Sequence, residues 1–240
     1  MAGPAVAQRG APAPKPSAAS TGKGQNAVAE AFVAAVRKRA AQGDADAEFD
    51  LGVLYDSGQG VPQDYAKAAD WYGKAAAQGI AGAEFNLGSL YGNGQGVPQD
   101  YAKAAYWYGQ AAAQGIVEAE SNLGSLYANG QGMTQDYAEA KYWVGKAAAQ
   151  GDADAEYNLG LLYYNGRGVP QDYAKAADWY GKAAAQGNAD AESNLGLLYY
   201  NGQGVTQDYA KAADWYGKAA AQGQAAAELN LGVLYDHGQG

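Results

Sequence analysis

The chain has 240 residues, a formal net charge of −9, and a high content of Gly (35) and Tyr (20). It contains no Cys, which excludes a disulfide framework, a thiolate zinc site and a cysteine nucleophile. No run of about 18 apolar residues occurs, so no membrane-spanning helix is expected. Residues 1–40 are basic and the remainder is acidic. Nucleic acid is therefore not expected as the main partner, because its phosphates would be repelled.

Residues 1–26 hold four of the seven prolines among Ala, Ser, Gly and Lys, and nothing there can build a core. A disordered tail is expected. Ala5-Val6-Ala7 is similar to the small-residue end of a signal peptide, but the apolar segment that should precede it is missing. The sequence leaves the compartment unknown: the missing signal-peptide segment would give a cytoplasmic protein, and a true start upstream would give a periplasmic or secreted one.

Residues 27–40 are predicted to form a capping helix ahead of the rest of the chain. Val28, Phe32, Ala35 and Val36 recur at helical spacing and would form its packing face. The basic run Arg37 to Arg39 favours the C-terminal end of the helix, where the helix dipole stabilises cations.

From Ala41 onward, one 36-residue pattern repeats. The first copy, AQGDADAEFDLGVLYDSGQGVPQDYAKAADWYGKAA, fills residues 41–76, and further copies begin at Ala77, Ala113, Ala149 and Ala185. A sixth begins at Ala221 and reaches Gly240 after its first half. Five complete repeats (41–220) and a half repeat (221–240) predict an all-α solenoid, because each unit buries its apolar face only against its neighbours.

Each copy contains two predicted helices, at about residues 45–56 and 65–78 in the first copy. Gly52 would let another helix approach closely, at a cost of about 1 kcal/mol relative to alanine. Gly58 ends the first helix and Asp64 is placed to cap the second. The apolar stripe of the first helix is Ala47, Leu51, Leu54 and Tyr55, and that of the second is Tyr65, Ala68, Trp71, Tyr72, Ala75 and Ala76.

These motifs resemble the Sel-one-like repeat (SLR) family, relatives of the tetratricopeptide repeats. The resemblance rests on LGxLY (Leu51 to Tyr55), the GxGV turn (Gly58 to Val61) and DYAKAAxWYxKAA (Asp64 to Ala76). It implies a right-handed α/α superhelix that mediates protein–protein interaction, as in adaptors of bacterial signalling, virulence and envelope biology. A cysteine-rich branch has been credited with β-lactamase activity, but its paired cysteines are absent here.

Little in the sequence supports chemistry. His237 is the only histidine and has no partner cluster, so neither a metal site nor a Ser–His arrangement is expected. Asp44, Asp46, Asp152 and Asp154 are interpreted as helix caps rather than calcium ligands. One Glu per copy is interpreted as an anion favoured in the first helical turn: Glu48, Glu84, Glu120, Glu156, Glu192 and Glu228.

The sequence therefore predicts an interaction scaffold with no catalytic residue, cofactor or metal. A cell-wall-acting hydrolase and an assembly module without a specific ligand are the alternatives. A binding groove is predicted from the differences between copies. The positions of Asp46, Phe49, Val53 and Asp56 vary and share one helical face. By resemblance to tetratricopeptide repeats, that face lines the concave surface.

In the fourth and fifth copies the predicted partner-binding residues are Tyr157, Asn158, Leu161, Tyr164, Asn165, Asn194, Leu197, Tyr200 and Asn201. No Lys or Arg occupies these positions, so a clamp for a carboxylate terminus is not expected. The preferred ligand is a peptide or protein segment with apolar anchors and basic flanks, and neutral drift on an exposed face is the alternative reading of the variation.

The C-terminal edge is predicted to be adhesive. Residues 221–240 supply a first helix without the second helix that covers it in other copies. Leu231, Leu234 and Tyr235 are expected to leave part of an apolar stripe uncovered. Either the chain is a fragment, or this edge self-associates.

Overall fold

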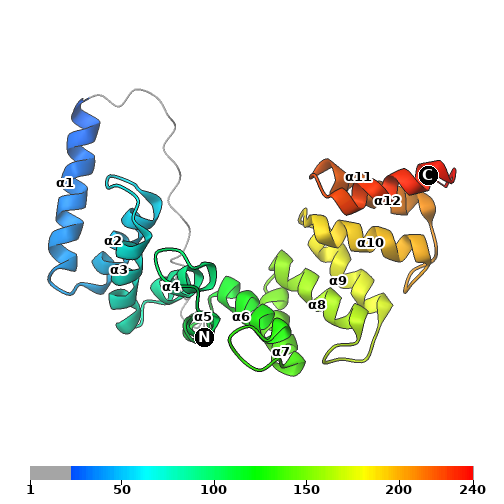
Figure 1. Ribbon diagram of the computed structural model, residues 1–240, viewed down its shortest axis with the longest axis horizontal. Helices are drawn as coiled ribbons and strands as arrows, with labels where there is room; N and C mark the ends of the chain where they lie inside the picture. The colour runs from blue at the N-terminus through cyan, green and yellow to red at the C-terminus, as the bar shows by residue number, and fades with distance from the viewer. Residues whose placement is uncertain (1–22, 240) are drawn as a thin grey trace, which may run out of the picture. The chain divides into compact units, whose positions relative to one another are not determined.

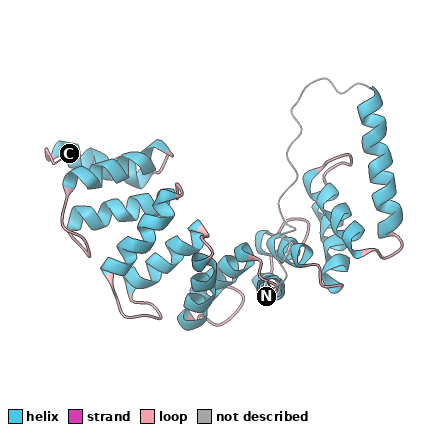
Figure 2. Ribbon diagram, turned by 180° about the vertical axis from the view of Figure 1, so that it is seen from behind, coloured by secondary structure: helices cyan, strands magenta, loops and turns pink. Residues whose placement is uncertain are grey.

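The computed structural model describes residues 23–239, and every regular element in that range is an α-helix (Figures 1 and 2). The helices are α1 (Lys23–Ala40), α2 (Ala45–Ser57), α3 (Tyr65–Ala77), α4 (Ala81–Asn93), α5 (Tyr101–Ala113), α6 (Val117–Asn129), α7 (Tyr137–Ala149), α8 (Ala153–Asn165), α9 (Tyr173–Ala185), α10 (Ala189–Asn201), α11 (Tyr209–Ala221) and α12 (Ala225–Asp236). They fall into two compact units, one with α1–α5 that ends at Ile116 and one with α6–α12 that begins at Val117. The predicted all-α repeat fold is confirmed, and residues 1–22 of the predicted tail lie outside the described range.

The first helix differs from its prediction. It begins at Lys23 rather than at residue 27. The side chains that it packs against α2 are Val33, Val36 and Ala40. Val28 and Phe32 are 71% and 56% exposed, and Ala35 is exposed as well. The predicted packing face was therefore wrong except at Val36. Because α1 is rich in alanine, several of its faces are apolar. The contact with α2 determines which of these faces is buried.

Capping residues set the ends of the repeated helices. The Asp64 carboxylate accepts a hydrogen bond from the backbone N–H of Lys67 where α3 begins. Gly58 ends α2 with a φ of 71°, in the left-handed region that favours glycine. Aspartates at the equivalent position cap α5, α7, α9 and α11. The predicted ends at residues 56 and 78 each differ from the structure by one residue.

Only half of the predicted first-helix caps act as caps. Asp44 and Asp152 each accept a hydrogen bond from a backbone N–H of the helix that follows. Asp46 and Asp154 lie instead within the first turn of α2 and α8. Their prediction as caps was wrong, because a capping side chain comes from the extended residue just before the helix.

The core consists of buried alanines and leucines, with one buried tyrosine in most of the hairpins. Tyr72 in the first unit and Tyr180 in the second are 0% exposed and packed among buried Ala and Leu residues. Burial raises the pKa of both phenols well above their usual range, so both rings stay neutral. The predicted core residue Trp71 is half-buried, and the Lys74 ammonium lies 3.6 Å from its ring centre. Lysine thus covers the outer side of the tryptophan.

In four of the first helices, α2, α4, α8 and α10, a glycine makes room for a tyrosine of the following helix. A Cβ on Gly52 would lie 2.5 Å from Cδ1 of Tyr72, and a Cβ on Gly160 would lie 2.6 Å from Cδ1 of Tyr180. Both distances are shorter than van der Waals contact. The predicted role of Gly52 in close helix approach is confirmed.

Replacing Gly160 with alanine is expected to lower the free energy of unfolding by roughly 1–3 kcal/mol, because the new methyl group would overpack Tyr180. Gly181 is a matched control within α9, since a Cβ there meets nothing within 4 Å. Gly181→Ala should raise the free energy of unfolding by up to about 1 kcal/mol through helix propensity. Urea unfolding followed by circular dichroism measures both. A shift of equal sign and size in the two variants would contradict the packing argument.

The C-terminal helix exposes Tyr235, as predicted, but the rest of its exposed apolar set differs from the prediction. Leu234 is 0% exposed and Leu231 is half-buried, so the prediction was wrong for Leu234. The exposed apolar side chains of α12 are Leu229 (70%), Val233 (39%) and Tyr235 (62%). Leu234 lies in the core cluster that α12 shares with α11. Self-association through this edge stays a prediction.

Candidate partner-binding groove

The nine predicted partner-binding residues lie on two helices of the second unit, α8 and α10. The helices α6, α8 and α10 are the first helices (helix A) of their repeats. We call the side of these helices that bears the predicted positions the helix-A face. Asn165 and Asn201 are exposed, and the other seven residues are half-buried. A half-buried side chain is held by the fold and still has surface to offer, which is the state expected of a preformed binding face.

The tyrosines of this face are fixed by other aromatic rings. The Tyr157 ring lies 5.8 Å from the Tyr180 ring, measured between centroids. Tyr164 contacts Tyr173 edge to face at 5.3 Å, and Tyr200 has the same relation to Tyr209 at 5.5 Å. Rings held in this way lose little conformational entropy when a partner binds.

The asparagines of the face are partly committed within the protein. The Asn158 amide donates to the Ser125 hydroxyl at 3.1 Å, and the Asn165 amide donates to the Leu161 carbonyl at 2.9 Å. Each amide nitrogen has two hydrogens, so one donor remains on each residue for a ligand. Asn158 and Asn165, which were predicted to bind a partner, therefore each keep one of their two donors for it.

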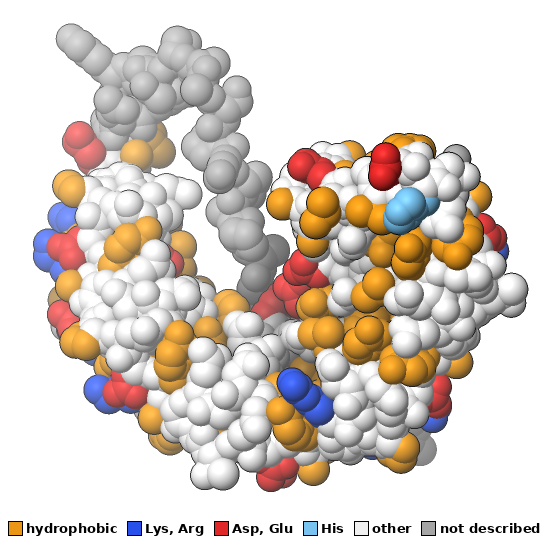
Figure 3. All heavy atoms as spheres, turned by 45° about the vertical axis from the view of Figure 1, so that its right-hand side comes forward, with side chains coloured by type: hydrophobic (Ala, Val, Ile, Leu, Met, Phe, Trp, Pro, Cys, Tyr) orange, Lys and Arg blue, Asp and Glu red, His pale blue; other side chains and the backbone are white. Residues whose placement is uncertain are grey.

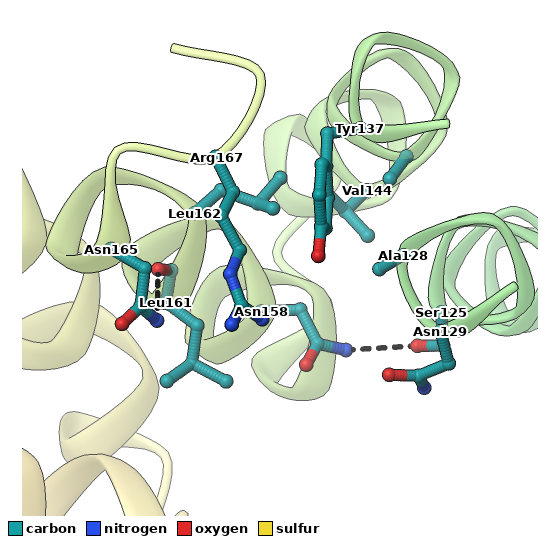
Figure 4. Close-up of a pocket in the computed structure, with 11 residues that line it drawn as sticks. Ser125, Ala128, Asn129, Tyr137, Val144, Asn158, Leu161, Leu162, Asn165 and Arg167 are labelled. Atoms are coloured by element: carbon teal, nitrogen blue, oxygen red, sulfur yellow. Dashed lines mark hydrogen bonds between the residues drawn. The ribbon is translucent and has the colours of Figure 1, made fainter. Parts of the chain in front are cut away.

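A hollow of about 210 Å³ opens between α6, α7 and α8 (Figure 4). Its lining includes three predicted residues, Asn158, Leu161 and Asn165. The rest of the lining is Ser125, Ala128, Asn129, Tyr137, Ala140, Val144, Leu162 and Arg167. A second hollow of about 90 Å³ includes the predicted residues Leu197 and Tyr200 in its lining. Five of the nine predicted residues thus border concave surface.

Arg167 adds a basic side chain beside the predicted positions, which themselves hold no Lys or Arg. It comes from the turn after α8, and its side chain reaches toward Asn158 (Figure 4). The guanidinium carbon lies 5.5 Å from the centre of the Tyr137 ring. Spacing along a single helix could not reveal this residue, because the turn brings it onto the face from outside the helix.

Acidic side chains border the N-terminal ends of α8 and α10. Asp154 and Asp190 are exposed there, and their carboxylates accept hydrogen bonds from Asn188 at 3.0 Å and Gln224 at 2.6 Å. In Figure 3, hydrophobic side chains form larger patches on the visible surface than the charged side chains, which are mostly scattered. The combination favours a ligand with apolar side chains and some positive charge.

The repeated glutamates have a structural role that the sequence indicated only in part. Glu48 is 5% exposed, and its carboxylate accepts a hydrogen bond at 2.7 Å from the side-chain amide of Gln78, at the end of the same hairpin. The same bond, at 2.8–2.9 Å, joins Glu84, Glu120, Glu156 and Glu192 to Gln114, Gln150, Gln186 and Gln222. Lys146 also forms an ion pair with Glu120 at 2.7 Å. These carboxylates are buried and close the hairpins.

Glu84→Gln is expected to raise the free energy of unfolding relative to the unchanged protein, and to raise it more at neutral pH than in acid. Burial raises the pKa of Glu84 above its usual value, although the hydrogen bond from Gln114 acts in the opposite direction. The folded state therefore binds this proton more tightly than the unfolded state, and stability falls as pH rises from the ordinary value of 4.5 through the raised pKa. Glutamine keeps the hydrogen-bond acceptor and removes the charge.

The measurement is the free energy of unfolding of the unchanged protein and of Glu84→Gln. It is made at neutral pH and at about pH 4, which is close to the ordinary pKa of glutamate. The difference should favour the variant more at neutral pH. Glu228 is exposed, so Glu228→Gln serves as the control and should show no such pH-dependent gain. A Glu84→Gln difference that is independent of pH would contradict the assignment.

The model of the Sel1 repeat matches residues 45–80, 81–116, 117–152, 153–188, 189–224 and 225–240. The chain belongs to the Sel1 repeat family. Each complete match spans one helical hairpin and the turn after it, from the start of a first helix to the residue before the next. The matched frame begins at residue 45 rather than at 41, because the starting point within a cyclic pattern is a matter of choice.

Solved Sel1 repeat structures are similar to this chain. A protective antigen of uropathogenic Escherichia coli strains, with an SLR fold, is 41% identical with a TM-score of 0.79. The match covers 86% of this chain and 44% of the antigen, so the chain spans less than half of that protein. A Sel1 repeat protein from Oxalobacter formigenes is 39% identical with a TM-score of 0.72, over 80% of this chain and 78% of that one. No curated protein sequence matches the chain.

Sel1 repeats generally mediate protein–protein interaction, and their fold is in general a non-catalytic scaffold. Among the described residues, no group of three or more His, Asp or Glu side chains is placed to hold a metal ion. Within the same range, no helix combines the length and the apolar character needed to cross a bilayer.

Proposed function

We propose that this Sel1 repeat protein is an adaptor that binds an extended segment of a partner protein along the helix-A face of its second unit. The supporting observation is that five predicted residues border two hollows on this face while ring contacts hold its tyrosines in place. A preformed surface of aromatic anchors with adjacent amide donors suits peptide recognition.

The partner segment should have apolar anchors with basic flanks. Tyr164, Leu197 and Tyr200 offer apolar surface for the anchors. Asp154 and Asp190 are exposed at the ends of the same helices and would attract the basic flanks. Charge complementarity of this kind steers association and fixes the orientation of the bound segment more than it adds affinity.

Site-specific photo-cross-linking in the native cell tests this proposal. A photoreactive phenylalanine at Asn201, exposed on the helix-A face, should cross-link one discrete partner, which mass spectrometry then identifies. The same group at Asp178, exposed on α9 and outside that face, should not cross-link it. Excess unmodified protein should compete for the Asn201 product. Equal cross-linking from both positions, or none from Asn201, would count against the helix-A face.

A further inference from the structure

We propose that the hollow between α6, α7 and α8 binds the side-chain carboxylate of a glutamate in a partner protein. This inference rests on the proposed function, since it names one contact of the segment that the helix-A face would hold. Two features of the third and fourth repeats, one steric and one electrostatic, meet at this place and at no equivalent place along the repeated sequence.

The steric feature is missing side-chain volume. Val144 stands where the other four complete copies have Tyr72, Tyr108, Tyr180 and Tyr216. Ser125 and Ala128 stand where the next copy has Leu161 and Tyr164. Between α8 and α10, the Tyr164 and Tyr180 rings occupy the corresponding space with centroids 6.5 Å apart. Smaller residues at all three positions leave the hollow of about 210 Å³.

The electrostatic feature is an arginine in place of a repeated glutamine. Arg167 stands where the other copies have Gln59, Gln95, Gln131, Gln203 and Gln239. In the part of the chain that the structure describes, Arg167 takes part in no ion pair. No Asp or Glu lines the hollow. A guanidinium that is held on a tyrosine ring and lacks a counter-ion presents a fork of donors that matches a carboxylate.

The shape of the hollow favours a carboxylate on a short apolar stem. Val144, Leu161 and Leu162 supply apolar wall, while Arg167 and the second hydrogen of the Asn158 amide supply donors. The volume is below the roughly 300–1,000 Å³ of a typical small-molecule site, so one side chain fits better than a whole ligand. Two methylenes of glutamate would lie on the wall with the carboxylate at the guanidinium. A phosphoryl group carries about two negative charges and would need more than one cation, whereas Arg167 is the one cation in the lining of this hollow.

Nuclear magnetic resonance titration with a blocked amino acid tests the site without a known partner. The probe is N-acetylglutamic acid α-amide, whose only charge is the side-chain carboxylate. It should shift the side-chain signals of Arg167 and Asn158 saturably, with a dissociation constant on the order of millimolar. N-acetylglutaminamide, the neutral isostere, should not. Equal shifts from both probes would overturn the proposal, and so would tighter binding of N-acetyl-leucine, which has only a chain-end carboxylate, or of inorganic phosphate.

Three variants distinguish the contribution of the arginine charge from that of the empty volume. Arg167→Gln installs the residue of the other copies at an exposed turn and should weaken binding of the probe at least tenfold, followed at Asn158. Val144→Tyr keeps the arginine but fills the hollow, and should abolish binding. Gln203→Arg adds an arginine where Tyr180 occupies the space, and should create no second site. Unchanged affinity in folded Arg167→Gln would overturn the assignment.

The two proposals fail separately. Absence of probe binding together with specific cross-linking from position 201 would remove the glutamate site and leave the adaptor function standing. Probe binding without any cross-linked partner would retain the site and count against the adaptor function.

Discussion

Replacing Tyr180 with alanine should lower the free energy of unfolding by about 3–5 kcal/mol, the range found when a buried aromatic side chain is truncated to a methyl group. Tyr180 is 0% exposed, and its ring lies against Gly160 and the Tyr157 ring. The glycine cannot fill the space that the ring leaves, because it has no side chain. Each repeat packs only on its neighbours, so the loss should be concentrated in the hairpin of α8 and α9.

Urea unfolding followed by circular dichroism and by tryptophan fluorescence provides the measurement. Tyr180→Phe is the matched control, because it keeps the ring and its contacts with Gly160. It should cost much less than the alanine variant. If Tyr180→Ala and Tyr180→Phe lose the same stability, the packing of the ring is not what stabilises the hairpin.

The second large effect is expected on binding. Once a partner is identified, the combined substitution of Tyr164 and Tyr200 by alanine should weaken its binding by at least about 2 kcal/mol, or roughly 30-fold in the dissociation constant. The two rings lie on α8 and α10, within the helix-A face, and are fixed by contacts with Tyr173 and Tyr209. Truncation removes both anchors and also the contacts that hold their neighbours.

Isothermal titration calorimetry measures the affinity, and circular dichroism must show that helicity is retained. Tyr142→Ala is the control, because Tyr142 is 56% exposed on α7 and does not line the hollows. Its affinity for the partner should be unchanged. An unaltered dissociation constant in the folded double variant would rule out this groove as the main site.

The repeats could be predicted closely because their signals are local. Asp64 and Gly58 mark a helix start and a helix end through the backbone conformations that they favour. Repetition of the same residues in every complete copy made those assignments secure. The role of Gly52 followed from the same logic, since a glycine inside a helix is costly unless a neighbour needs the space.

The features that were missed depend on contacts between distant residues. Glu48 was interpreted through the helix dipole alone, although Gln78 repeats with it in every complete copy and could have been recognised as its partner. Arg167 and Val144 line the same hollow only because the turn after α8 lies close to α7. No spacing rule along one helix predicts that meeting. The buried face of α1 was missed because its residues differ from those of the repeated second helices, although Ala40 to Gly43 matches Ala76 to Gly79.

The hydrogen bond between Glu156 and Gln186 spans 30 residues, and the corresponding bonds in the other complete copies span the same distance. Every hairpin thus has its closing partners within its own stretch of chain. On a ribosome that adds about 5–20 residues per second, a stretch of 30 residues is synthesised in roughly 1.5–6 s. Each hairpin can close before the next has been synthesised, so the protein can assemble in the order of translation without waiting for its C-terminus.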